Sequence, residues 1–367
     1  MDLLDVKILA CLDKYGPRNV SAIARELRLP YETVRKRFKR LVSRFFVEFP
    51  LSVYHTYIGL KKAFVFADAV PGCEDALFEC MKANDFWTYV GQFYGRCEGS
   101  YAIYTVPVDH LGRFEEFVRE LGETSLTRSV RILWSTCLQS VNPTENWFSL
   151  DSQEWLFDWD GWMKEIPDEG TELPPTLVEP EGFPIKADDN DILILAELEV
   201  DYTTKMKEIA KTLNMTPEAV GYHYKNHILK RGLIEKSQVF FHRFDKAISD
   251  FFVFVFRFDD EEKTAKFASS LLDKPFVYGL GKLIGENGLI AHVCLPRREF
   301  RGFIRSISEL IRRGFLQAYE YLIEDYDRKQ AQTISYEYFK DGTWIYNHKK
   351  HIENLRKTVE KAEQASS

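Results

Sequence analysis

Apolar residues recur every three to four positions in three short segments at the start of the chain. This spacing predicts helices over residues 2–14, 20–28 and 31–44. In the third segment Val34, Phe38 and Leu41 share one face, because positions i, i+4 and i+7 fall on the same side of a helix. Three short helices in this arrangement are typical of a helix-turn-helix, whose third helix enters the major groove of DNA.

After residue 50 the apolar pattern changes to strand-like runs separated by two amphipathic stretches. The predicted elements are strand 63–67, helix 74–83, strands 86–94 and 100–106, helix 111–121 and strand 127–135. The second half gives strand 251–258, helix 261–272, strands 275–284 and 288–295, helix 299–312 and strand 315–323. Both halves therefore have the order βαββαβ, which is that of a ferredoxin-like domain.

The two halves also match at one fixed offset of about 186 residues. Asp5 falls on Asp191 and Leu27 falls on Leu213 at this offset. A constant offset through two helices indicates an internal repeat. The sequence therefore predicts an α+β fold, in which two (winged) helix-turn-helix domains alternate with two ferredoxin-like domains by internal duplication.

Six segments follow from this pattern. They are an N-terminal helix-turn-helix at 1–50, a ferredoxin-like domain with an acidic aromatic tail at 51–165, a Pro-rich acidic linker at 166–187, a second helix-turn-helix at 188–240, a second ferredoxin-like domain with a tail at 241–345, and a C-terminal helix at 346–367. The prolines make the linker a semi-rigid, extended spacer. The rings between Trp147 and Trp162 either cap the preceding α/β unit or recruit a partner.

Charge is distributed unevenly along the chain. The net charge is −7 overall, yet residues 1–50 hold eleven Lys and Arg against six Asp and Glu, a net of +5. Residues 151–190 hold twelve acidic residues against two Lys, a net of −10. DNA responds to charge within a Debye length of about 8–10 Å, so the basic first segment can bind DNA although the whole chain is acidic.

The remaining composition indicates a cytoplasmic protein. No apolar run approaches the roughly 18–20 residues that a membrane span requires. The start of the chain lacks the basic and apolar regions of a signal peptide. The six cysteines follow no framework spacing, so we expect them to be reduced thiols.

The outer faces of the two third helices carry the candidate DNA-binding residues. In the first copy these are Tyr31, Thr33, Arg35, Lys36, Arg37, Lys39, Arg40 and Arg44; in the second they are Thr216, Tyr222, His223, Lys225 and Asn226. Arginine can bond bidentately to guanine, asparagine can read adenine, and cations neutralise phosphates. The first copy has far more positive charge, so we expect two unequal heads on double-stranded DNA.

No catalytic or metal centre is expected from the motifs. His223 and His227 have the i, i+4 spacing of zinc ligands, but no Glu-x-x-His signature surrounds them and His227 is expected to face the core. No nucleophile motif is recognisable either. The prediction is therefore a protein that is not an enzyme and has no cofactor.

These motifs resemble the Lrp/AsnC (feast/famine) family of bacterial and archaeal transcription regulators. The resemblance lies in the runs 4–9, 20–27 and 31–41, in their second copies, and in Leu229 to Ile234, which is similar to that family's exit from the recognition helix. It implies α/β units that pair, here within one archaeal-like chain as a pseudo-dimer. It also implies a small-molecule effector, although the family's Gly-x-Tyr-Asp effector turn is only approximated at 91–95 and 281–285.

Three functions follow as alternatives. The first is a DNA-binding transcription regulator that recruits a general transcription factor or RNA polymerase. The second is an enzyme, since sirohaem decarboxylases resemble the same family and the run Tyr94-Gly95-Arg96 with Tyr101 is faintly similar to theirs, although their His-rich signature is absent. The third is a protein-interaction scaffold that has lost DNA binding.

Overall fold

Three helices begin each half of the chain. The structure is a computed structural model that describes residues 1–95 and 97–366. The first head (residues 1–50) contains α1 (Leu3–Tyr15), α2 (Val20–Glu26) and α3 (Tyr31–Phe45); the second head (residues 188–240) contains α7 (Asp189–Val200), α8 (Met206–Thr212) and α9 (Pro217–Tyr222), which continues as a π-helical segment over His223–Leu229. Asp2 and Asp188 begin α1 and α7 with the same capping box, paired with Asp5 and Asp191 respectively.

Each head leads into a βαββαβ unit. The first unit contains β2 (Leu60–Ala69), α4 (Glu74–Met81), β3 (Trp87–Tyr94), β4 (Gly99–Pro107), α5 (Leu111–Gly122) and β5 (Thr127–Ser135). The second unit contains β8 (Ser249–Arg257), α10 (Glu261–Leu271), β9 (Val277–Lys282), β10 (Gly288–Pro296), α11 (Arg297–Arg312) and β11 (Ala318–Ala331). The predicted α+β fold class is thus confirmed.

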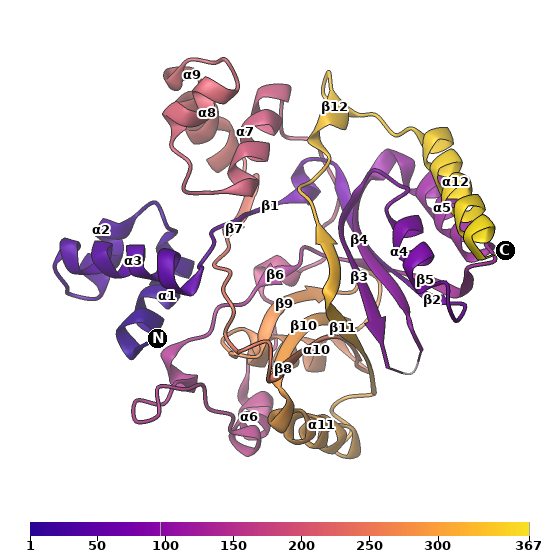
Figure 1. Cartoon of the computed structure of the whole chain (residues 1–367). Coiled ribbons are helices and arrows are strands. Elements are labelled where there is room, and N and C mark those ends of the chain that lie inside the picture. The colour runs from indigo at the N-terminus through magenta and orange to yellow at the C-terminus, as the bar shows by residue number, and fades with distance from the viewer. Residues whose placement is uncertain (96, 367) are drawn as a thin grey trace.

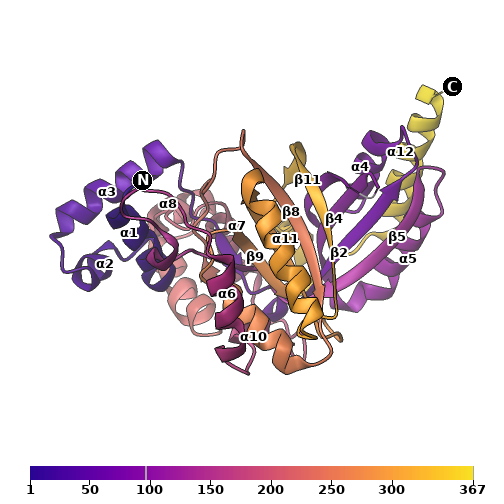
Figure 2. The same ribbon diagram turned by 90° about the horizontal axis from the view of Figure 1, so that it is seen from below.

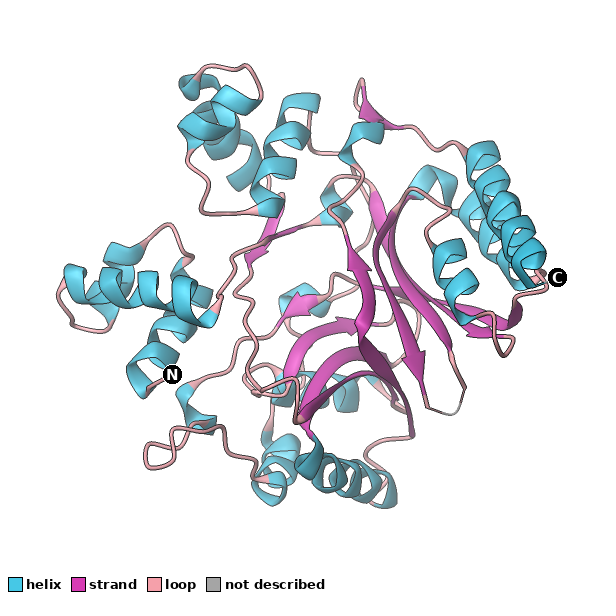
Figure 3. Ribbon diagram, in the orientation of Figure 1, coloured by secondary structure: helices cyan, strands magenta, loops and turns pink. Residues whose placement is uncertain are grey.

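The two units share one nine-stranded antiparallel sheet. Its strand order is β5-β2-β4-β3-β11-β8-β10-β9-β6, where β6 is Gln139–Ser140. Strand β11 joins the halves, because it pairs with β8 of its own unit and with β3 of the other. The outer edges also meet where Ser135, at the end of β5, bridges to Leu283 beyond β9. The sheet therefore curls around an interior, with the helices on its outside (Figure 1, Figure 2 and Figure 3).

Side chains from both units fill the interior of the curled sheet. Successive residues of a strand point to opposite faces. Phe64 and Phe66 of β2 accordingly join an inner cluster with Val253 and Ile290 of the second unit. Val65, between them, packs in the outer cluster with residues of α4 and α5. The alternation along β2 thus builds both the inner core and the layer under the helices.

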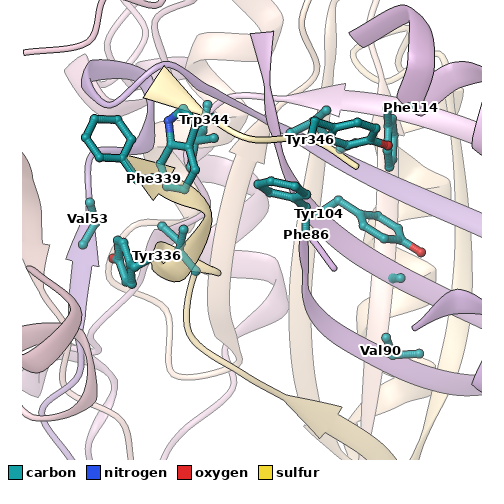
Figure 4. Close-up of a cluster of buried hydrophobic side chains, with 14 of the residues drawn as sticks. Val53, Phe86, Val90, Tyr104, Phe114, Tyr336, Phe339, Trp344 and Tyr346 are labelled. Atoms are coloured by element: carbon teal, nitrogen blue, oxygen red, sulfur yellow. The ribbon is translucent and has the colours of Figure 1, made fainter. Parts of the chain in front are cut away.

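The tail that follows each unit packs on the opposite unit. The first tail contains α6 (Trp159–Glu165); the second contains β12 (Phe339–Lys340), β13 (Thr343–Trp344) and α12 (His348–Ser366). Trp162 stacks on Phe303 of the second unit with ring centroids 5.8 Å apart. Tyr346 stacks on Phe86 of the first unit at 5.3 Å (Figure 4). The rings do cap α/β units, but the sequence grouped each tail with its own unit and the structure corrects this.

The linker is more tightly held than its composition suggests. We expected residues 166–187 to be an extended spacer, yet Leu177 is fully buried. The hydroxyl of Thr176 hydrogen-bonds Gln139, and the carboxylate of Glu179 pairs with Lys282. Its acidic and hydroxyl side chains bind groups on the sheet, so this segment is part of the packed structure.

The strands that follow the two heads pair with each other. Strand β1 (Leu51–Val53) runs antiparallel to β7 (Ile234–Ser237). Leu51 pairs with Ser237, which is its own counterpart at the sequence offset. The winged form expected for each head therefore stays a prediction, because the strand beside each head is shared between the halves.

Candidate nucleic-acid interface and a polar cleft

Helix α3 of the first head places lysines on its outer face. Val34 and Leu41 are fully buried, as predicted for the inner face. Lys36 and Lys39 lie on the opposite side and are exposed, as is Arg44 in the last turn. The first turn adds the exposed ring of Tyr31 and the half-buried Thr33. These side chains form a surface that can meet a DNA backbone.

Three of the arginines predicted to contact DNA form ion pairs within the protein. Arg37 Nη1 lies 2.6 Å from Asp2 Oδ2 and 3.0 Å from Asp5 Oδ1, and Arg40 pairs with Asp5 as well. These bonds connect α3 to the start of α1. Arg35 pairs with Glu32 on its own helix, with Nη2 and Oε2 2.7 Å apart. The sequence placed Lys36, Lys39 and Arg40 outward and Arg35, Arg37 and Arg44 on the flanks; the structure instead pairs Arg35, Arg37 and Arg40 with carboxylates of the same head.

The ion pairs shift the acidity of the carboxyl that they hold. Burial alone would raise the pKa of Asp2, but hydrogen bonds from Arg37 and from the backbone of Asp5 outweigh this and lower it to about 2. Asp5 itself has no exposed surface. The carboxylate of Asp2 consequently stays charged, and it holds Arg37 against α1 together with Asp5. This cluster stabilises the head and fixes the angle at which Lys36 and Lys39 are presented.

The second head presents a smaller polar surface. Thr216 caps α9 by accepting a hydrogen bond from the backbone of Ala219 at 3.1 Å. Tyr222 and Lys225 are exposed, while Asn226 accepts a hydrogen bond from Lys230. His223 does not face outward, since its Nδ1 lies 2.8 Å from Asp191 Oδ1. The structure therefore removes His223 from the predicted outer set and leaves Tyr222 and Lys225 as its clearest members.

The two heads contact each other through Arg18, which the sequence did not single out. Its guanidinium donates hydrogen bonds to the backbone carbonyls of Tyr202 and Thr204 in the second head. It also lies over the ring of Tyr202, 4.9 Å from the centroid, and Tyr202 bonds Tyr224 at 2.8 Å. These contacts hold the heads on the same side of the molecule (Figure 1).

A polar cleft of about 480 Å³ opens where the halves meet beside β1. Its lining includes His55, Lys62 and Glu199, which come from both halves. Behind this lining, Cys137 Sγ lies 3.2 Å from His55 Nδ1, and Ser52 donates a hydrogen bond to Glu235 at 2.7 Å. The residues are far apart in sequence and share no motif, so the sequence held no local signal for this cleft.

Burial shifts the titration of several groups around the cleft. It raises the pKa of Glu199 to about 7, although a backbone hydrogen bond from Ile334 acts in the opposite direction. It also raises the pKa of the Glu235 carboxyl and lowers that of the His55 imidazole. Desolvation disfavours the charged form in each case. The cleft thus combines groups whose charged forms are disfavoured by burial with the half-buried side chain of Lys62.

A second polar group lies inside the curled sheet. The Tyr101 hydroxyl donates a hydrogen bond to the buried carboxylate of Glu324, and Lys329 pairs with the same carboxylate at 3.0 Å. Tyr94 is partly exposed at the end of β3, and Arg96 lies outside the described residues. The structure therefore does not bring Tyr94 and Tyr101 together into one site, which was part of the enzyme alternative.

Among the described residues, no helix combines the length and the apolar character that crossing a membrane requires.

Residues 1–42 match the family model of the AsnC-type helix-turn-helix domain. The resemblance to the Lrp/AsnC family predicted from the sequence is confirmed for this domain. No curated protein matches the chain.

Solved structures resemble the chain over its whole length. The siroheme decarboxylase NirDL aligns over 98% of this chain and 99% of its own, with 12% identity and a TM-score of 0.52. The same enzyme in complex with an iron-uroporphyrin III analogue aligns over 97% and 98%, with 13% identity and a TM-score of 0.50. At this identity the likeness establishes a common fold. An AsnC family regulator from Agrobacterium tumefaciens aligns over only 36% of this chain, with 16% identity and a TM-score of 0.30, and supports no further argument.

These matches correct one expectation. The sequence motifs led us to expect that the chain is not an enzyme. The solved structures that match its full length are of an enzyme, so that expectation is contradicted. The chain combines an AsnC-type helix-turn-helix with an overall fold that a decarboxylase also has.

Proposed function

We propose that this chain is a sequence-specific DNA-binding transcription regulator of the cytoplasm, with two unequal heads on one intramolecular pseudo-dimer. The observation that carries the proposal is the exposed face of α3, formed by Lys36, Lys39 and Arg44, within the AsnC-type domain. Arg37 and Arg40 support this face from behind through Asp2 and Asp5. Exposed cations on a third helix neutralise phosphates and can reach base edges in the major groove.

The second head adds asymmetry to the proposed interface. It offers Tyr222 and Lys225 where α3 of the first head exposes Lys36, Lys39 and Arg44, and hydrogen bonds from Arg18 connect the two heads. We therefore expect an asymmetric DNA site, in which the first head contributes most of the affinity. The acidic side chains of the first tail, whose rings are buried on the second unit, are the part of the surface that can recruit RNA polymerase or a general transcription factor.

A salt series of binding to genomic DNA fragments tests the proposal. Retained fragments are sequenced, and their affinities are measured at increasing salt for the wild type and for Lys36→Ala/Lys39→Ala. Selective retention that the double variant loses supports a regulator. Equal retention of every fragment, or no retention at low salt, contradicts it. Lys349→Ala is the matched control, because Lys349 is exposed on the distant helix α12.

A second candidate function is the binding and decarboxylation of a tetrapyrrole. Two observations favour it: the full-length fold shared with the siroheme decarboxylase NirDL, and the polar cleft between the halves. Lys62 can pair with a substrate carboxylate there, and the neutral acid of Glu199 can donate a hydrogen bond to it. Decarboxylation breaks a carbon–carbon bond, releases CO₂ and leaves a carbon that takes up a proton.

Anaerobic titration with sirohaem separates the two candidates. Saturable absorbance changes that Lys62→Ala and Glu199→Gln abolish, together with loss of CO₂ from the pigment by mass spectrometry, support the second function. Binding without loss of CO₂ supports a tetrapyrrole-sensing regulator instead. Absence of any spectral change contradicts both readings of the cleft and leaves the DNA proposal unaffected.

A further inference from the structure

Four potential metal ligands converge at the base of the second head. Asp188 and Asp191 lie at the start of α7, and His223 and His227 lie in the π-helical segment that follows α9. One ligand atom from each residue lies within 4.8 Å of all the others. Asp191 is fully buried and the other three are partly buried. Only the histidine spacing was recognisable in the sequence, because the two aspartates come from a helix more than thirty residues away.

The separations between these atoms fit tetrahedral coordination. Zinc binds nitrogen and oxygen ligands at about 2.0–2.1 Å, so the ligands of a tetrahedral site lie about 3.3 Å apart. His223 Nδ1 lies 2.8 Å from Asp191 Oδ1 and 3.6 Å from Asp188 Oδ1. His227 Nδ1 lies 3.1 Å from Asp191 Oδ1 and 3.2 Å from Asp188 Oδ2. The four distances lie between 2.8 and 3.6 Å, with Asp188 facing His223 through Oδ1 and His227 through Oδ2, and one ligand atom of each residue lies within 4.8 Å of the others.

The surrounding bonds hold the carboxylates in position. The backbone of Asp188 donates to Asp191 Oδ2, and that of Asp191 donates to Asp188 Oδ1, both at 3.0 Å. Arg231 bonds the carbonyl of Lys186 at 2.7 Å and approaches Asp191 Oδ2 at 3.4 Å. Partners that orient the first ligands in this way are usual at metal sites. The π-helical geometry begins at His223 itself, and such segments are frequent at functional sites.

The first head shows what the aspartate pair requires. Asp2 and Asp5 have the same capping box as Asp188 and Asp191, and the guanidinium of Arg37 neutralises them. At the sequence offset, the residue in place of Arg37 is His223. The second head thus keeps both carboxylates and replaces the cation with imidazoles. The guanidinium of Arg231 reaches only the edge of this cluster, at 3.4 Å from Asp191 Oδ2, so two carboxylates and two ring nitrogens face one another as a set of metal-ligating groups.

We propose that Asp188, Asp191, His223 and His227 form a divalent metal site selective for zinc. The two nitrogen ligands favour zinc over magnesium or calcium, which prefer oxygen alone. The ion connects α7 to the recognition segment, as Arg37 connects α1 to α3 in the first head. The site goes beyond the proposed DNA-binding function and does not depend on it.

Zinc titration of the full chain tests the assignment. The protein is stripped with EDTA, reduced, and titrated with zinc by calorimetry and with cobalt by absorption. We expect one ion per chain and the visible bands of tetrahedral cobalt. A strong thiolate charge-transfer band would place the ion on the cysteines and overturn the assignment. Absence of one-to-one binding would do the same.

Two variants separate metal binding from folding. His223→Ala should weaken zinc binding about 100-fold or more, since loss of an outer partner alone costs about 10–100-fold. His223→Arg restores the residue of the first head, so it should fold without metal and lose the thermal stabilisation by zinc. His110→Ala, distant in the first unit, is the control. Equal zinc affinity in wild type and folded His223→Arg refutes the site.

Discussion

Replacing Lys36 and Lys39 with alanine should weaken DNA binding through lost phosphate contacts. Both ammonium groups are exposed on α3, and within the part of the chain that the structure describes neither lies within ion-pair distance of a carboxylate. Each phosphate contact releases counterions and contributes about 0.9 to the slope of log K against log salt. The double variant should therefore lose about 1.8 from this slope. At about 0.15 M salt, that corresponds to about fivefold per contact and about 30-fold for the pair.

Fluorescence anisotropy with a retained genomic fragment measures this slope between about 50 and 200 mM salt. Lys349→Ala controls for the general loss of positive charge. Arg37→Ala is a second comparison, in which a cation of the same helix is removed that pairs with Asp2 and Asp5. Its loss should lower the thermal stability of the protein. An unchanged slope in the double variant, with DNA binding intact, refutes the assignment of the α3 face. An equal decrease of the slope in Lys349→Ala would show that the effect is not specific to the α3 face.

Three further predictions concern the packed core and the cleft. Glu199→Gln should stabilise the protein by about 1–3 kcal/mol above pH 7. The raised pKa of Glu199 makes the free energy of unfolding of the wild type fall as the pH rises from about 4.5 to 7. Urea titrations in which the difference between variant and wild type is the same at pH 5 and pH 8 contradict this. Trp162→Ala should lower the free energy of unfolding by about 3–5 kcal/mol in the same assay, since the ring is fully buried on the opposite unit. A loss below about 1 kcal/mol refutes the packing of the first tail on the second unit. Arg243→Met should lower the free energy of unfolding by about 3 kcal/mol or more, because the buried guanidinium donates hydrogen bonds to the carbonyls of Pro275, Val277 and Val141. An unchanged melting temperature contradicts this prediction.

Local periodicity predicted the elements well, because side-chain burial has the period of the local backbone. The helix expected at 31–44 is α3 (Tyr31–Phe45), and the helix expected at 74–83 is α4 (Glu74–Met81). The last strand was expected at 315–323 and extends from Ala318 to Ala331. Its additional residues pair with β3 of the other half. That pairing is a long-range contact, and no local pattern in the strand encodes it.

The candidate sites divide in the same way. Helical geometry places Lys36 and Lys39 outward, and the structure agrees. The same geometry could not reveal that Arg37 is neutralised, because Asp2 and Asp5 lie on another helix. The internal repeat did contain one signal. At the fixed offset both aspartates recur, whereas Arg37 is replaced by His223. Comparing the two copies in this way shows which partner of the two carboxylates has changed.

The exchanged tails make the whole chain the unit that folds. The first tail caps the second α/β unit through Trp162, and the second caps the first unit through Tyr346. Strand β11 similarly completes a sheet with β3, and β1 pairs with β7 of the other half. Each half therefore lacks a cap, a strand partner and one wall of the cleft when it is alone. Both heads are attached through the paired strands β1 and β7, so the pairing of the two halves also sets how the heads are presented.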